Sequence, residues 1–368
     1  MKVLGVIPSD RLDDYERGGI GSWLAGYYNP QGFFDRVYCL SPLERRQEER
    51  FGMVVIPTRP RQLASRVRQL HLDVLRAYGG AWPADFLARA RGTGIPLVVS
   101  VHTSNPVMLS EKVRAADLVF CTSGIVAETV RARGVSEGAI RILPNRVDRN
   151  RFCPDPDDPG ALALRARFPW RNGILHVARY SPEKNLKTVI AALAHLGPEF
   201  GLVAVGQGDA ALYRQQAEAQ GVADRCVLLG PVPNAELPSY YRFCACLCVP
   251  SRFEGFGIVF IEAMACGATV VTSAIAPMTE YIRDGVSGIL VEAFEDPKAV
   301  ASAIARACQD PARRAIGEAA RESSRPFAVE AVDSLEVSFY REALALDQGR
   351  PRGAAAPWWG RLRGALPW

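Results

Sequence analysis

The stretch "PSRFEGFGIVFIEAMACGATVV", residues 250–271, is the part of the chain that most clearly indicates the fold. It follows an apolar run and contains a glycine-rich loop, a helix-like apolar segment and a second apolar run. Strand, loop, helix and strand in this order are typical of parallel α/β sheets. Glu254 and Glu262 lie here with seven residues between them. Because an unpaired buried carboxylate is strongly destabilising, both acids need a ligand or a protein partner.

The same alternation of apolar runs and helix-like segments continues through the chain, from "KVLGVI" near the start to "ILHVA" and "GLVAVG" after residue 170. It predicts an α/β protein, and 368 residues exceed the size at which a single core stops growing, roughly 250–300 residues. We therefore expect two doubly wound, Rossmann-like domains facing a cleft. The expected boundaries are an N-terminal domain at 1–150, a linker at 151–170, a C-terminal domain at 171–325, a helix at 326–347 that packs back on the N-terminal domain, and a basic, tryptophan-containing tail at 348–368.

Composition excludes several classes of protein. Apolar residues make up 48% and charged residues 23%, and the net charge is only +5, so bulk charge does not suggest nucleic-acid binding. The sequence contains no run of about 18 apolar residues, so a membrane-spanning helix is not expected. The nine cysteines, without an export signal, are expected to be reduced and cytosolic. Cys244, Cys246 and Cys248 alternate, which favours small buried residues on one strand face over a metal site.

The loop of the opening stretch has the features of a phosphate-binding turn. Gly255 and Gly257 flank Phe256, which lets the backbone approach a ligand closely. The helix that follows presents free N–H groups and a positive dipole end. Glu262 lies inside that helix. It faces solvent or a polar ligand group such as a hydroxyl pair, or it is a buried structural acid bonded to neighbouring backbone, and the residues alone leave these alternatives open.

A second group of charged residues lies in "HVARYSPEKNLKTVI", residues 176–190. Ser181 and Pro182 predict the start of a helix after the strand. Arg179 and Lys184 flank that start, and two cations beside free N–H groups suit a diphosphate. The alternative is a solvated basic helix start without a ligand.

Two motifs in the N-terminal half are weaker indications of a ligand-binding site. The glycine-rich segment "DYERGGIGSWLAGYY", residues 14–28, can cradle phosphate but lacks the lysine of a P-loop. His102 follows the apolar run "VVSV", on the ligand edge of a parallel sheet, although a lone histidine is more often structural. The acidic run "DPDDP" in the expected linker is more typical of a solvated turn than of a metal site.

Together these motifs resemble the retaining GT-B nucleotide-sugar glycosyltransferases, the group-1 glycosyltransferase family. The resemblance is carried by "EGFGIVFIEAMACG", "HVARYSPEKN", "AVGQGD", "LLGPVPNAELPSYY" and "ILPNRVD". It is strong over about 140–310 and weaker over 1–140, where only "GGIG" and "HTSN" match. The chain departs from the pattern at Arg146 and Asn185, where glycine is common, and at Tyr180, where leucine is common.

The resemblance implies a role for each matching residue. Glu254 would contact hydroxyls of the donor sugar, and Glu262 would bind the nucleotide ribose. Arg179 and Lys184 would neutralise the departing diphosphate. His102 would meet the donor sugar from the opposite wall of the cleft.

Further residues are implied in donor binding by the same resemblance. Backbone groups of the glycine loop would hold the diphosphate, Gly19 would approach the same phosphates, and Val232 would line the base pocket. The implied catalytic residues are Glu254, His102, Arg179 and Lys184. The implied donor-binding residues are Gly19, Arg179, Lys184, Val232, Glu254, Gly255, Phe256, Gly257, Ile258 and Glu262. No cofactor and no metal is implied, because the cations and the helix dipole would do the electrostatic work.

The implied activity is transfer of a hexosyl-type sugar from a nucleoside-diphosphate sugar to an acceptor hydroxyl, with retention, in envelope or extracellular glycan synthesis. A glycan or lipid-linked molecule is the expected acceptor. The alternatives are a nucleotide-sugar epimerase of the same fold and a non-catalytic nucleotide-sugar-binding subunit.

A cytoplasmic protein with peripheral contact to an anionic membrane is expected from two basic segments. Residues 51–72 carry four arginines, Arg59, Arg61, Arg66 and Arg68, and residues 349–368 carry four more beside three tryptophans. Arginine beside tryptophan suits a bilayer interface. The alternative is a solvated basic face and a tail without a partner.

Overall fold

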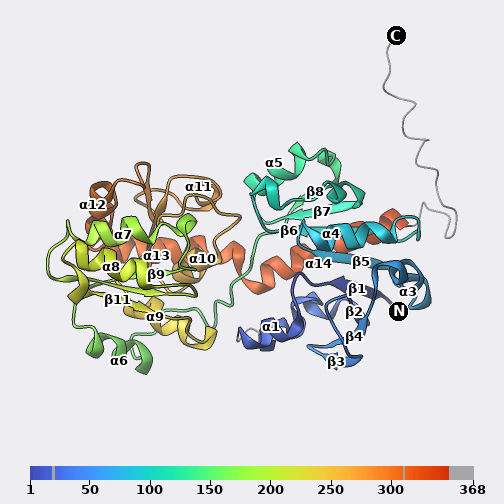
Figure 1. The fold of residues 1–368 in the computed structure, drawn as a ribbon, viewed down its shortest axis with the longest axis horizontal. Helices are drawn as coiled ribbons and strands as arrows, with labels where there is room; N and C mark the ends of the chain where they lie inside the picture. Colours follow the sequence, from blue (N-terminus) through green and yellow to red (C-terminus); the bar gives the residue numbers. More distant parts are fainter. Residues whose placement is uncertain (19–20, 310, 348–368) are drawn as a thin grey trace, which may run out of the picture. The chain divides into compact units, whose positions relative to one another are not determined.

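The computed structural model describes residues 1–18, 21–309 and 311–347, and the chain divides into two compact units (Figure 1). The first unit contains residues 1–122, 126–143 and the chain from Asp333 onward. The second contains residues 123–125 and 144–332.

The first unit is built on an eight-stranded sheet in the order β3-β4-β2-β1-β5-β6-β7-β8. All neighbours are parallel except β3, which runs antiparallel to β4. The first strand lies inside the sheet, and the chain winds outward from it in both directions, so the order reverses between β1 and β5. The strands are β1 (Val3–Ile7), β2 (Arg36–Ser41), β3 (Glu48–Arg50), β4 (Met53–Pro57), β5 (Val74–Tyr78), β6 (Leu97–Val101), β7 (Leu118–Cys121) and β8 (Ile140–Ile142).

Short helices connect these strands, and a long one ends the described chain. The α-helices are α1 (Leu12–Arg17), α2 (Gly21–Tyr27), α3 (Leu63–Gln69), α4 (Trp82–Leu87), α5 (Gly124–Ala132) and α14 (Val329–Asp347). The 3-10 turns are η1 (Pro30–Gly32), η2 (Pro60–Gln62), η3 (Ala88–Ala90), η4 (Pro106–Met108), η5 (Glu111–Ala115) and η6 (Glu137–Ala139).

Helix α14 is tied to the first sheet by a buried ion pair. Arg76, in the middle of β5, pairs with Glu336 of α14, and both side chains are buried. The same guanidinium donates to Tyr340 Oη at 2.7 Å and to Ser100 Oγ at 2.8 Å. Because removing one partner of such a pair leaves an uncompensated buried charge, on the order of 3–5 kcal/mol depends on it.

The second unit is a six-stranded sheet in the order β11-β10-β9-β12-β13-β14, parallel throughout. Numbered within the unit this is 3-2-1-4-5-6, the order of the Rossmann fold. The strands are β9 (Asn172–Val177), β10 (Phe200–Val205), β11 (Cys226–Leu229), β12 (Cys246–Val249), β13 (Thr269–Ser273) and β14 (Ile289–Val291).

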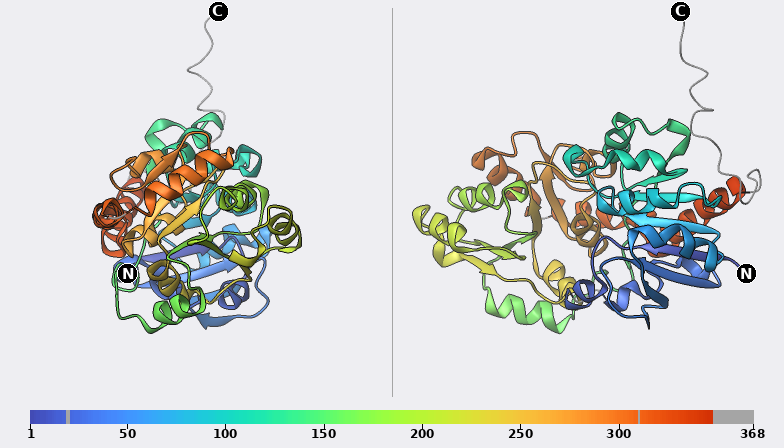
Figure 2. Two further views of the ribbon diagram at one scale, coloured as in Figure 1. Left: turned by 90° about the vertical axis from the view of Figure 1, so that its left-hand side faces the viewer. Right: turned by 45° about the vertical axis from the view of Figure 1, so that its right-hand side comes forward.

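Helices cover both faces of this sheet (Figures 1 and 2). Alternate strand residues enter two cores. Leu175 and Leu247 pack with α9 and α10, while Ile174 and Cys246 pack with α7, α8 and α12. The helices of the unit are α6 (Pro159–Arg167), α7 (Leu186–Leu193), α8 (Ala211–Ala219), α9 (Leu237–Phe243), α10 (Ile258–Ala265), α11 (Met278–Tyr281), α12 (Pro297–Ala307) and α13 (Ala312–Ser323), with 3-10 turns η7 (Pro182–Lys184), η8 (Ala223–Arg225), η9 (Asn234–Glu236) and η10 (Arg325–Phe327).

The structure differs from the sequence interpretation in the segment 151–170, which was expected to be a linker. It contains helix α6, and the whole of 144–332 belongs to the second unit. Asp158 caps α6 by accepting from Gly160 N at 2.9 Å, and Pro159 occupies the first helical position. An aspartate followed by proline is a helix-start signal, so this helix was readable within the Asp- and Pro-rich run.

Four further sequence expectations concern the cysteines, a metal site, a membrane-spanning helix and the tail. Within the described residues none of the nine cysteines forms a disulfide, and Cys246 and Cys248 are buried beside each other in the core formed with α7 and α12. Among the residues placed by the structure, no group of three possible metal ligands is found. No helix in that part of the chain is long and apolar enough to cross a membrane. The tail 348–368 lies outside the described residues.

Candidate functional site

The residues predicted to bind a ligand in the second unit gather where the strand order reverses. Strand β9 lies between β10 and β12, so the loops that follow β9 and β12 diverge at the carboxyl edge of the sheet. In open parallel sheets this switch point is where ligands bind. Arg179 and Lys184 follow β9, and Glu254 through Ile258 follow β12.

Lys184 and Glu254 are in contact across this switch point. Lys184 Nζ lies 2.5 Å from Glu254 Oε1, and the side chains are only 17% and 10% exposed. Ser251 Oγ donates to the same oxygen at 3.0 Å. The sequence interpretation placed both residues at one ligand but did not foresee that they bond to each other or that Ser251 joins them.

Arg179 is placed differently from Lys184. Its side chain is 69% exposed, and its guanidinium lies 3.1 Å from Oε1 of Glu183, four residues later in the chain. An exposed pair of this kind is worth well under 1 kcal/mol, so it exchanges readily for a stronger anion. Arg179 therefore lies beside the Lys184 pair with its charge accessible from solvent.

The loop after β9 is held by the loop after β10. A Cβ at Gly206 would lie 1.7 Å from the carbonyl oxygen of Ala178, so only glycine permits this approach. Tyr180 N donates to Gln207 O at 2.8 Å, and Tyr180 Oη lies 2.8 Å from Ala204 O. The tyrosine that departs from the family pattern thus fixes the loop carrying Arg179 to the edge of the sheet.

Asn185, the second departure in this segment, is explained by the backbone. It has φ of 57° and ends the turn η7 before α7 begins. Asparagine tolerates this left-handed conformation better than other non-glycine residues. Its side-chain amide donates to Phe294 O at 3.0 Å, which fixes the turn beside Lys184.

The glycine loop leads directly into α10. Gly257 has φ of 82°, and a Cβ there would lie 2.4 Å from the buried ring of Phe260. Phe256 is buried, stacks on Tyr281 with ring centroids 5.3 Å apart, and accepts from Tyr281 Oη through its carbonyl at 2.6 Å. These contacts hold the loop, so the unsatisfied N–H groups at the start of α10 form a fixed anion-binding end.

Glu262 lies on α10 and is 6% exposed. Tyr241 Oη donates to Glu262 Oε2 at 2.8 Å, and no hydrogen bond to Oε1 is found among the described residues. Burial raises the pKa of Glu262 to about 7, while the Tyr241 bond and the charge of Arg151 lower it in part. The structural alternative raised from sequence, a bond to neighbouring backbone, is wrong in detail, because the partner is a side chain on α9.

His176 was missed by the sequence interpretation. It lies in the interior of β9, its Nδ1 is 2.8 Å from Cys248 O, and its buried Nε2 has no hydrogen-bond partner among the residues that the structure describes. Burial lowers its pKa to about 4, and the positive charge of Lys184 adds to that shift. The imidazole is therefore neutral at neutral pH. A histidine inside an apolar strand carries no sequence signal that distinguishes it from a core residue.

In the first unit, His102 is exposed at the end of β6 and lines a cavity of about 500 Å³. The cavity lies where the strand order reverses, beside Ser9 after β1 and Gly79 after β5. Its wall is aromatic, formed by Tyr15, Tyr27, Tyr28, Tyr78 and Trp82. The structure therefore places His102 at the ligand edge of its own sheet.

Gly19 and Val232 are the two other residues predicted to bind the donor. Gly19 lies outside the described residues. Val232 is half-buried and packs against the core formed with α9 and α10.

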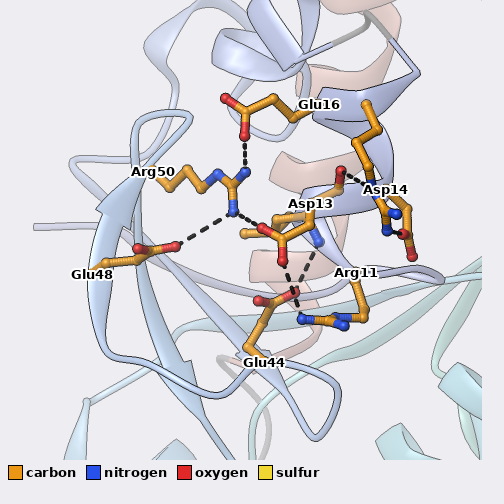
Figure 3. A network of polar contacts seen from close by, with 9 residues as sticks. Arg11, Asp13, Asp14, Glu16, Glu44, Glu48 and Arg50 are labelled. Atoms are coloured by element: carbon orange, nitrogen blue, oxygen red, sulfur yellow. Dashed lines mark hydrogen bonds and ion pairs between the residues drawn. The ribbon is translucent and has the colours of Figure 1, made fainter.

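A charged network holds the helix before the glycine-rich segment (Figure 3). Arg50 of β3 pairs with Asp13 at 2.6 Å, with Glu16, and with Glu48 at 3.5 Å. Glu44 Oε1 accepts from the amide of Leu12 at 2.8 Å, at the start of α1. Residues 14–17, at the start of the glycine-rich segment 14–28, are thus helical and fixed, which positions the point where the glycines begin.

Comparison with known proteins agrees with this geometry. Residues 167–323 match the family described as "Glycosyl transferases group 1", and residues 25–151 match "Glycosyltransferase Family 4". A D-inositol 3-phosphate glycosyltransferase from Xylanimonas cellulosilytica is 34% identical over 279 residues, which cover 68% of this chain and 67% of the relative. The chain belongs to the group-1 glycosyltransferases, and it is a glycosyltransferase with the GT-B fold.

Two further similarities show how far the likeness extends. A GDP-mannose-dependent alpha-(1-6)-phosphatidylinositol monomannoside mannosyltransferase from Mycolicibacterium smegmatis is 31% identical over 54% of this chain and 55% of its own. Among eight such relatives, the aligned part spans 52% to 72% of the relative's length. The crystal structure of Anabaena HepE in complex with UDP shares the fold, with a TM-score of 0.76, 22% identity, and coverage of 93% of this chain and 100% of that one.

Proposed function

We propose that this glycosyltransferase moves a sugar from a nucleoside-diphosphate sugar to an acceptor hydroxyl, with retention of anomeric configuration. The observation that carries the proposal is the contact of Lys184, Glu254 and Ser251 at the switch point of the second sheet, beside the N-terminus of α10. A cation, a sugar-bonding carboxylate and a helix N-terminus in one place suit a sugar diphosphate. The UDP complex of Anabaena HepE supports the same donor class.

In the proposed reaction, the bond between the anomeric carbon and the diphosphate oxygen breaks and its electron pair goes to the diphosphate. Lys184 and Arg179 stabilise the added negative charge. The acceptor hydroxyl forms the new bond on the same face, and its proton passes to a diphosphate oxygen. Glu254 holds donor-sugar hydroxyls and His102 contacts the transferred sugar. No resident metal or cofactor takes part, because two cations and a helix dipole supply the electrostatic stabilisation.

Glu262 is proposed to hold the ribose through its Oε1. Hydrogen bonds from ribose hydroxyls to this carboxyl group are charge-assisted, and therefore strong, only when it is ionised. Since the pKa of Glu262 is raised to about 7 in the free protein, ribose binding competes with protonation near neutral pH. The remaining donor contacts are proposed for Gly19, Val232 and the glycine loop through Ile258.

The acceptor is proposed to bind in the aromatic cavity of the first unit. Tyr28 packs edge-on against Tyr27 and Tyr78, with ring centroids 5.3 and 4.8 Å apart, so the wall is rigid. Such a wall suits a ring-bearing acceptor. The names of the inositol-phosphate and phosphatidylinositol relatives support a sugar-like or lipid-linked ring, and an envelope or extracellular glycan as the product.

Two alternatives make different predictions. A nucleotide-sugar epimerase of this fold would convert the donor without any acceptor. A non-catalytic subunit would bind the donor and release it unchanged. The retained Lys184, Arg179, Glu254 and Glu262 favour a transferase over both.

A thermal-shift panel of nucleotides and nucleotide sugars, followed by acceptor screening with the best donor, tests the proposed function. Transfer to an inositol phosphate or a lipid-linked glycan, with the anomeric configuration read by NMR, supports it. Donor turnover that needs no acceptor identifies the epimerase, and binding without turnover across the panel identifies the subunit.

We further propose a cytoplasmic enzyme with peripheral attachment to an anionic membrane. Arg59, Arg61 and Arg68 are exposed on η2 and α3, and Arg66 is half-buried. Each basic residue near an anionic surface contributes about 1 kcal/mol at most. Sedimentation with anionic liposomes at low and high salt tests this, comparing the full chain with one ending at Asp347. If the full chain stays in the supernatant at low salt, the proposal of membrane attachment is wrong, and a soluble acceptor is favoured.

A further inference from the structure

A second cavity lies at the opposite edge of the second sheet from the donor loops. Its volume is about 600 Å³, and it is lined by Gly173 at the start of β9, Ala245 before β12 and Thr269 at the start of β13. Strands of this length rise roughly 3.3 Å per residue, so about 15–20 Å of sheet separates it from the switch point. It therefore takes no part in the donor site described above.

The lining of this cavity is strongly cationic. It contains six arginines and a single acid, Glu318. The arginines come from α6, the segment before β9, α9 and α13, and they are Arg165, Arg171, Arg242, Arg313, Arg314 and Arg321. Four separate elements thus bring like charges together, which is unfavourable unless an anion compensates them.

Most of the hydrogen bonds that these arginines make do not neutralise their positive charge. Arg242 is paired with Asp158 at 2.7 Å and is structural. Arg165 instead donates to the carbonyl of Arg242 at 2.6 Å, and Arg321 donates to the carbonyl of Ala265 at 2.7 Å. A carbonyl carries no net charge, so these bonds orient the guanidinium groups without neutralising them.

Two of the arginines are ready to take a ligand. Arg171 and Arg314 are exposed, and within the described part of the chain neither guanidinium makes a hydrogen bond or an ion pair. Gly317 allows α13, which carries Arg314, to pack directly against the loop after α10. A Cβ at Gly317 would lie 2.3 Å from the carbonyl oxygen of Gly267, so a larger residue would push the helix away from this loop. Glycine at this position allows the arginine-bearing face of α13 to line the cavity.

We propose that this cavity, termed the arginine pocket, binds a small anion that carries at least two phosphate groups. Guanidinium forks bind phosphate oxygens in bidentate fashion, and several forks around one cavity suit adjacent phosphates better than a single carboxylate. The volume lies within the range of small-molecule sites, about 300–1,000 Å³. The phosphates can belong to a soluble diphosphate or to a lipid headgroup, and the experiment separates these sources.

Arginine footprinting on the full chain tests the proposal without any substitution. The protein is modified with phenylglyoxal with and without inorganic pyrophosphate, at ionic strength matched with chloride, and each arginine is followed by peptide mass spectrometry. We expect pyrophosphate to slow modification of Arg171 and Arg314 at least fivefold while that of Arg89, an exposed arginine of the other unit, is unchanged. Equal rates at Arg171 and Arg314 with and without pyrophosphate would overturn the proposal.

Calorimetry separates the arginine pocket from the donor loops, which also suit pyrophosphate. Pyrophosphate is titrated into Lys184→Ala and into the same variant with Arg171→Gln and Arg314→Gln. Each lost charge-assisted contact weakens binding by on the order of tenfold, so the two together should cost about a hundredfold. A matched control with Arg89→Gln and Arg91→Gln, two exposed arginines of the first unit, should bind as Lys184→Ala does. Retained affinity in the Arg171/Arg314 variant would refute the pocket, whatever becomes of the donor site.

A vesicle arm identifies the source of the phosphates. Sedimentation with phosphatidic acid vesicles, compared with phosphatidylcholine vesicles, is measured for the full chain and for the Arg171→Gln/Arg314→Gln variant. Vesicle binding that the variant loses and pyrophosphate displaces supports a lipid headgroup. Pyrophosphate binding without such vesicle binding supports a soluble diphosphate. Absence of both overturns the proposal.

Discussion

Replacement of Glu262 by glutamine should make the protein more stable at high pH, although it removes a residue proposed to bind the donor. Glu262 is buried, and burial raises its pKa from 4.5 to about 7. At roughly 1.4 kcal/mol per pH unit, this corresponds to about 3 kcal/mol. Because the folded-state pKa is raised, Glu262 contributes most stability below about pH 4.5. That contribution is lost as the pH rises through about 7.

The measurement is the urea midpoint of the wild type and of Glu262→Gln at several values between about pH 5 and 8. Glutamine does not titrate, and its side-chain oxygen can still accept from Tyr241. The stability difference in favour of the variant should therefore grow by about 3 kcal/mol across this window. Glu218→Gln, on an exposed glutamate of α8, is the matched control and should show no such growth. Parallel pH curves for the wild type and Glu262→Gln would refute the buried, proton-binding carboxylate.

The same variant tests the proposed role of Glu262 in binding. If ribose hydroxyls donate to the ionised carboxylate, affinity for a nucleoside diphosphate should rise with pH as Glu262 loses its proton. Calorimetry of the wild type should show this rise between about pH 5 and 8, and Glu262→Gln should bind weakly and without it. An unchanged affinity in the variant would exclude Glu262 from the donor site while leaving its effect on stability intact.

The remaining predictions concern the donor loops. Lys184→Ala and Arg179→Ala should fold and lose about a hundredfold in transfer rate, since each removes a contact worth on the order of 3 kcal/mol to the charged transition state; normal turnover in both would remove the phosphate assignment. Lys184→Ala should also lower the melting temperature more than Arg179→Ala, because only Lys184 pairs with a buried carboxylate. Glu254→Gln should weaken binding of the intact donor while leaving the free nucleoside diphosphate nearly unaffected, and calorimetry on both ligands would contradict this if the two losses were equal. Transfer should survive EDTA, and activity that is abolished by EDTA and restored by magnesium or manganese would count against a metal-free mechanism.

Much of the architecture was readable from sequence because it depends on local signals. Alternating apolar runs and helix-like segments predicted two doubly wound sheets, and the chain folds into two units with these orders of strands. The glycine loop and the helix after it were readable because Gly257 requires a positive φ, and glycine is the residue that supplies it. Helix α6 was also encoded locally, by Asp158 and Pro159, but the proline-rich composition around it hid the signal.

The pairing of buried charges was decided only by the tertiary structure. Lys184 finds Glu254 seventy residues away, and Tyr241 finds Glu262 across two helices. Arg76 stands in an apolar strand and acquires its partner, Glu336, 260 residues later. A periodic pattern shows that a residue faces inward but not what it meets there. Side-chain partners, the pKa of Glu262 and the gathering of arginines from four elements depend on which segments fold side by side, and no local stretch of sequence specifies that.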